Sequence, residues 1–127
     1  MNVYEPENSD VLEWIASASP KEWPASDWDF YVCNGRNDQL ILEKANDPNL
    51  EHRVFFVHCL YHIVGDYFLW NSSNEKFRKR IDQLMACVDE ASSIEVTKWL
   101  VETEDLLSAK SEFVQNYWIG FMFFDKL

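Results

Sequence analysis

The stretch from Leu50 to Trp70 constrains the fold of this chain more than any other part of the sequence. Placed at about 100° per residue, its apolar side chains cover about half of a helical wheel. They are Phe56, Val57, Leu60, Tyr61, Ile63, Val64, Tyr67 and Phe68. The pattern predicts a long central helix, the most buried element of the protein. Because Asp66 interrupts this stretch and the other apolar runs are also too short for a bilayer, we expect no membrane span.

Helix start and stop signals divide the rest of the chain into further amphipathic helices. The expected boundaries are Ser9 or Asp10 to Pro20, Asn37 or Asp38 to Ala45, Phe77 to Ala91 after the capping turn 71–74, Ser92 or Ser93 to Leu107, and a last segment from Glu112 to Phe124. Residues 20–35 stay open between helix, strand and irregular loop, because they contain two prolines and end at the turn dipeptide Asn34-Gly35.

The whole chain, residues 1–127, is expected to form a single α-helical domain with five or six helices. Three Gly and four Pro residues are few for a protein of many short strands and turns. Asp47-Pro48 between two expected helices resembles the short joints of stacked pairs such as HEAT repeats, which keeps HEAT-like helix pairing open. No residue pattern recurs at a period of about 30 to 45, so an irregular helical bundle is preferred.

Helical phasing also predicts which side chains form the core. The set expected to be buried together is Phe56, Leu60, Ile63, Val64, Tyr67, Ile81, Leu84, Trp99 and Leu106.

The charge balance excludes some classes of partner. The chain has 22 acidic and 11 basic residues, a net charge of −11, which repels phosphate backbones. The basic cluster of Lys76, Arg78, Lys79 and Arg80 is expected to be the solvated face of one helix rather than a nucleic-acid site. Three scattered cysteines without a C-x-x-C spacing indicate reduced thiols, and the polar, acidic start is unlike a secretory signal. We therefore expect a cytoplasmic protein.

The negative charge is concentrated in two parts of the chain. Residues 1–31 have seven acids and one base, residues 89–112 have seven acids and two bases, and the remainder sums to zero. The two segments could adjoin in space and form one surface for a basic protein partner. The residues expected to represent that surface are Asp10, Glu13, Asp27, Asp29, Glu95, Glu102, Glu104 and Asp105.

His58, His62 and Asp66 are the most suggestive candidates for metal ligands, at successive steps of four residues along the central helix. Two imidazoles one turn apart are a common half-site, but a full site needs ligands from another helix. On the wheel these residues lie opposite the apolar face, so a solvated or hydrogen-bonded polar stripe is the preferred interpretation. Gly65, beside them, is a place where another segment could cross closely.

Other candidate sites are weaker. Cys33 precedes Asn34-Gly35 and could be exposed on a turn, yet no partner histidine can be assigned to make it a nucleophile. No P-loop, G-x-G-x-x-G, G-x-S-x-G or H-E-x-x-H motif is present. Trp23 and Trp28 either fold down onto the helices, as most loop aromatics do, or form part of a contact surface.

These features favour a non-enzymatic, acidic protein-binding module without a cofactor, and its oligomeric state is left open. Its specific form is expected to be that of bacterial immunity proteins and antitoxin-like inhibitors, which occlude a basic partner. The first alternative is a metal-dependent enzyme or metal-binding bundle that uses His58, His62 and Asp66. The second alternative is a structural or regulatory helical module.

Overall fold

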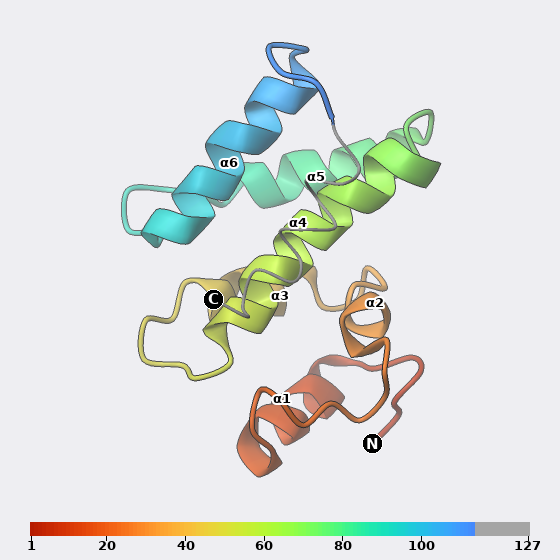
Figure 1. Ribbon diagram of the computed structural model, residues 1–127, viewed down its shortest axis with the longest axis vertical. Helices are drawn as coiled ribbons and strands as arrows, with labels where there is room; N and C mark the ends of the chain where they lie inside the picture. Colours follow the sequence, from red (N-terminus) through yellow and green to blue (C-terminus); the bar gives the residue numbers. More distant parts are fainter. Residues whose placement is uncertain (114–127) are drawn as a thin grey trace.

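The computed structural model describes residues 1–113, which form an all-α fold of six helices without a strand (Figure 1). The helices are α1 (Asn8–Ser17), α2 (Trp28–Val32), α3 (Asp38–Ala45), α4 (Arg53–Trp70), α5 (Glu75–Ala86) and α6 (Ile94–Leu107). The predicted fold class and helix number are therefore confirmed for this part of the chain. Of the last predicted segment, Glu112–Phe124, only the first two residues are described. No helix within residues 1–113 is long and apolar enough to cross a membrane.

Helix α4 is the centre of the bundle, as its sequence predicts, and it contacts α2, α3, α5 and α6. Its burial is more complete than an amphipathic wheel implies, because buried residues lie on nearly every side of it. His58, expected on a solvated or hydrogen-bonded polar stripe, is buried, and so is Gly65, where the sequence allowed another segment to cross closely. The expectation of a solvated stripe is wrong at His58 because neighbouring elements cover this helix on several sides, α2 among them, whereas the burial of Gly65 agrees with close packing there.

The predicted core is confirmed with one difference. Eight of the nine side chains are buried, and Leu106 is partly buried against the same cluster. Three tryptophans, Trp14, Trp28 and Trp99, are among the largest fully buried side chains. Large aromatic groups of this kind contribute much of the apolar area that folding removes from water.

Local capping explains where two helices begin. The side chain of Asn74 accepts a hydrogen bond from the backbone N–H of Phe77, and the side chain of Ser93 accepts one from Val96. Both positions agree with the predicted caps. Helix α1 instead begins after Glu7, because Glu7 and Asp10 form a reciprocal capping box.

The segment that the sequence left open consists of a loop and the short helix α2. Trp14 Nε1 donates a hydrogen bond to the carbonyl oxygen of Glu22 at 2.9 Å and so ties the loop to α1. Gly35 has φ +94°, which favours glycine, and the turn there leads into α3. Asn37 is buried and donates hydrogen bonds to the carbonyl oxygens of Pro6 and Val32, which anchor the N-terminal segment to this turn.

Candidate functional site

The two acidic segments do not adjoin. Figure 1 shows α1 and α6 toward opposite ends of the long axis, with α4 between them. The expectation that one continuous surface unites them is therefore not met, because the central helix separates the elements that carry them. Two separate acidic surfaces remain as candidates.

In the N-terminal segment the acidic residues differ in what their carboxylates do. Asp10 accepts hydrogen bonds from the backbone N–H groups of Glu7 and Asn2, and these bonds lower the pKa of its carboxyl. Glu13 is exposed and lies 3.9 Å from the amino terminus. Asp10 therefore stabilises the start of α1, whereas Glu13 remains on the surface.

Asp27 and Asp29 lie at the beginning of α2. Asp27 is exposed and forms no ion pair with any residue in 1–113. Asp29 Oδ2 lies 3.8 Å from His62 Nδ1 on α4, and Asp66 Oδ2 lies 3.8 Å from His62 Nε2. Helix α2 therefore presents one carboxylate to solvent and one to the histidine that α4 places beneath it.

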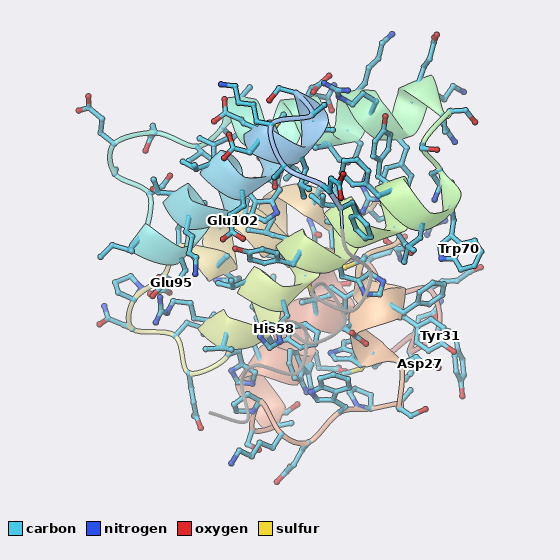
Figure 2. All side chains as sticks on the ribbon, turned by 45° about the horizontal axis from the view of Figure 1, so that its top comes forward. Asp27, Tyr31, His58, Trp70, Glu95 and Glu102 are labelled. Carbon is cyan, nitrogen blue, oxygen red and sulfur yellow. The ribbon has the colours of Figure 1, made fainter. Side chains whose placement is uncertain are left out.

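On α6, two of the predicted carboxylates stabilise the fold. Glu95 pairs with Arg53 of α4, and this hydrogen bond is the main cause that lowers the pKa of its carboxyl. Glu102 accepts a hydrogen bond from the Tyr61 hydroxyl at 2.8 Å and lies 4.0 Å from Lys98. Figure 2 shows Glu95 and Glu102 along the same helix. Both contribute to packing of α6 on α4 and are poor candidates for contact with a partner.

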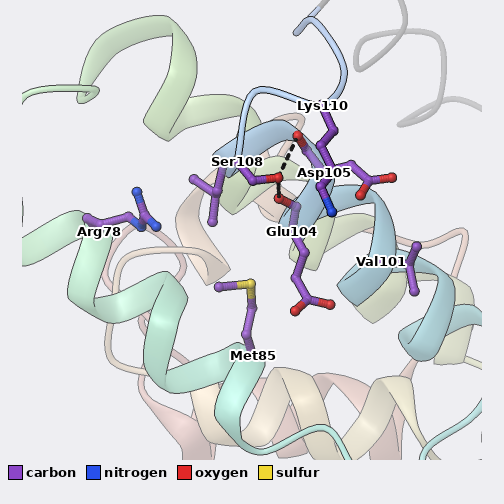
Figure 3. A pocket seen from close by; sticks show the side chains of 8 residues that line it. Arg78, Met85, Val101, Glu104, Asp105, Ser108 and Lys110 are labelled. Atoms are coloured by element: carbon purple, nitrogen blue, oxygen red, sulfur yellow. Dashed lines mark hydrogen bonds between the residues drawn. The ribbon is translucent and has the colours of Figure 1, made fainter.

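Glu104 and Asp105 line an open groove of about 430 Å³ between α5 and α6 (Figure 3). Arg78 and Lys110 also line it, and Met85 gives it an apolar wall. The groove therefore combines cations and carboxylates. Its mixed charge indicates no single class of small ligand.

The proposed metal ligands are not assembled into a complete site. His58 is buried, and His62 is placed between two carboxylates as described above. Within residues 1–113, no group of three His, Cys, Asp or Glu side chains is arranged to hold a metal ion.

Cys33 is buried rather than exposed on a turn, and its thiol donates a hydrogen bond to the carbonyl oxygen of Cys59 at 3.6 Å. Burial is the main cause that raises the pKa of the Cys59 thiol, which opposes nucleophilic reactivity there. The local turn signal at Asn34-Gly35 is correct, but α4 covers the residue before it. The structure thus offers no exposed thiol at this turn.

Arg80 differs from its expected surroundings, whereas Trp28 and, in part, Trp23 agree with the preferred prediction that they fold onto the helices. Arg80, expected on a solvated face, points inward and pairs with Asp38. Trp28 belongs to the core, whereas Trp23 remains partly exposed. The centroid of the Trp23 ring lies 5.5 Å from that of the Phe55 ring. The contact-surface interpretation therefore fails for Trp28.

Sequence reasoning missed a group of aromatic side chains, which we call the aromatic face: Tyr4, Phe30 and Trp70, which are exposed, and Tyr31, which is half-buried and contacts the first two. Its one signal in the sequence is the alternation of acidic and aromatic residues from Asp27 to Tyr31. Helical phasing does not reveal that α2 turns Phe30 outward while it buries Trp28.

Comparison with known proteins adds no assignment: no protein family, curated protein or solved structure matches this chain.

Proposed function

We propose that this protein is a non-enzymatic binding module whose negative surface recruits a basic protein partner. In its specific form it is an inhibitor that occludes that partner, as immunity proteins and antitoxin-like inhibitors do. The observation that carries the proposal is the distribution of charge: the net −11 comes entirely from residues 1–31 and 89–112. A concentrated negative field accelerates association with a cationic surface.

The geometry supports a contact at one end of the molecule. Asp27 and Glu104 are exposed carboxylates in the two acidic segments, and neither forms an ion pair within the described part of the chain. Because α4 separates the segments, a compact partner contacts one of these carboxylates and leaves the other in solvent. The two positions therefore provide a matched pair for experiment.

The test begins with purification of the tagged protein from its native host and identification of bound proteins by mass spectrometry. Association and dissociation rates are then measured by surface plasmon resonance at low and physiological salt. We expect the association rate to fall by about tenfold or more with salt, while dissociation changes less. Asp27→Lys and Glu104→Lys each change the net charge by the same amount. The variant with the lower association rate therefore marks the end of the molecule that contacts the partner.

An acidic partner, or an association rate that neither salt nor either charge reversal changes, would refute the proposal and leave the charge as a solubility feature.

The metal-binding alternative predicts a different result. It requires a stoichiometric metal in protein purified without chelator, which elemental analysis measures directly. Loss of that metal in His58→Ala and His62→Ala would make the alternative the better account.

A further inference from the structure

The aromatic face exposes large rings although the chain has a complete core. Tyr4 is 67%, Phe30 54% and Trp70 78% exposed. The rings of Tyr4 and Phe30 each pack edge-on against Tyr31, with centroids 5.2 and 5.6 Å apart. Figure 2 shows Tyr31 and Trp70 on the same side of the molecule, with Asp27 beside them. Exposed aromatic groups of this size are typical of binding surfaces.

Three carboxylates lie on or next to the helices that carry Phe30, Tyr31 and Trp70. Phe30 packs edge-on against the His62 ring, 6.0 Å between centroids, and His62 lies between Asp29 and Asp66. Trp70 follows Asp66 by one helical step of four residues on α4. Asp27 adds an exposed carboxylate at the start of α2. The face therefore combines exposed rings with one exposed carboxylate, Asp27, whereas Asp29 and Asp66 are partly exposed and lie beside His62.

This combination of rings and carboxylates suits arginine better than lysine. A guanidinium group stacks flat on an aromatic ring and donates to a carboxylate through its planar fork, whereas an ammonium group is a compact, strongly hydrated point charge. The exposed apolar residues of α6, Ile94 and Val101, are aliphatic and offer no such stacking. We infer that the aromatic face is the contact surface and that it binds an arginine-rich surface of the basic partner. This inference rests on the proposed function and deepens it.

The experiment compares oligoarginine and oligolysine peptides of equal length by isothermal titration calorimetry at physiological salt. Charge attraction alone treats the two peptides alike, so a preference for arginine reports stacking or pairing of the planar fork with carboxylates, and loss of the preference when the rings are removed assigns it to stacking. We expect the protein to bind oligoarginine about tenfold more tightly than oligolysine. The double variant Phe30→Ala, Trp70→Ala should lose this preference. The matched variant Ile94→Ala, Val101→Ala, which also removes two exposed apolar side chains, should keep it.

Circular dichroism of each variant verifies that its helices form, which we expect because all four side chains are exposed. Equal binding of the two peptides by the unaltered protein would overturn the inference. So would loss of the preference in the α6 variant to the same extent as in the aromatic variant.

The native partner separates this inference from the proposed function. If that partner is basic and binds in a salt-dependent way, but Phe30→Ala, Trp70→Ala binds it as tightly as the unaltered protein, the aromatic face is wrong and the proposed function stands. If the partner is acidic, the proposed function itself fails. A loss of affinity for a basic partner confined to the aromatic variant supports both.

Discussion

Replacing Arg80 by Ala removes the ion pair that joins α5 to the elements before it. Arg80 Nε lies 2.6 Å and Nη2 2.9 Å from the two carboxylate oxygens of Asp38, and Nη2 also donates to the carbonyl oxygen of Cys33 at 2.9 Å. The guanidinium carbon lies 5.1 Å from the centroid of the Phe77 ring. One side chain therefore links α5 with the start of α3 and the end of α2.

The expected cost follows from the burial of this pair. The Arg80 and Asp38 side chains are 18% and 16% exposed, so the substitution leaves the Asp38 carboxylate in a largely buried position without this partner. Breaking a buried ion pair costs about 3 to 5 kcal/mol, and the remaining exposure lets water offset part of it. We expect Arg80→Ala to lower the free energy of unfolding by about 2 to 4 kcal/mol. The midpoint of urea unfolding should fall by roughly 1 to 2 M.

Urea titration followed by tryptophan fluorescence measures this change, and Arg78→Ala is the matched control on the same helix. Arg78 Nε pairs with Asp82 at 3.1 Å, but on an exposed face, so its loss should cost about 0.5 kcal/mol or less. Removing both charges, with Arg80→Met and Asp38→Leu, should cost less than Arg80→Met alone. If Arg80→Ala and Arg78→Ala destabilise the protein equally, the argument from burial is refuted.

Three further predictions concern the core, a thiol and a carboxyl. Ile81→Ala should lower the free energy of unfolding by about 2 to 5 kcal/mol because it leaves a cavity. The control Ile94→Ala, at an exposed position, should change it by less than about 0.5 kcal/mol. Equal losses of stability in denaturant titrations would contradict the burial of Ile81. Cys87, the exposed one of three cysteines, should react with Ellman's reagent in the folded protein, and a second fast thiol would contradict the burial of the other two. The hydrogen bond from Arg53 lowers the pKa of Glu95, so this carboxyl stabilises the folded state above its ordinary pKa of 4.5, and that contribution is lost as the pH falls through the lowered value. The difference in the free energy of unfolding between the unaltered protein and Glu95→Gln should therefore decrease in acid. In an Arg53→Met background, the effect of Glu95→Gln should show no such pH dependence. A difference that persists in acid would show that the pair with Arg53 is not the cause.

The candidate site could be predicted from the sequence only in part. The concentration of acidic residues is a property of the chain, and Asp27 and Glu104 are exposed in the structure. Their neighbours Glu95 and Glu102 look equivalent in the sequence but bond to Arg53 and Tyr61 of α4. Partners that lie about forty residues away leave no local signal, so the sequence could not separate carboxylates that stabilise the fold from those that face solvent.

The sequence by itself determined the features that depend on near neighbours. Asn74 and Ser93 begin helices because each side chain satisfies a backbone N–H three residues later, a contact within one turn. The phasing of Ile81 and Leu84 places them inside because a helix repeats its faces at a constant interval.

Only the tertiary structure decided which polar faces of a helix are covered by other helices. His58 is buried because helices distant in sequence pack against one another, although the helical wheel placed it opposite the apolar face. The same packing buries Trp28, in agreement with the preferred of its two interpretations. Arg80 points inward because Asp38 and the Cys33 carbonyl meet it from two other elements. The acidic segments lie apart because α4 stands between α1 and α6 (Figure 1). These outcomes depend on how the helices pack in three dimensions, and the spacing of residues along one helix contains no information about its neighbours.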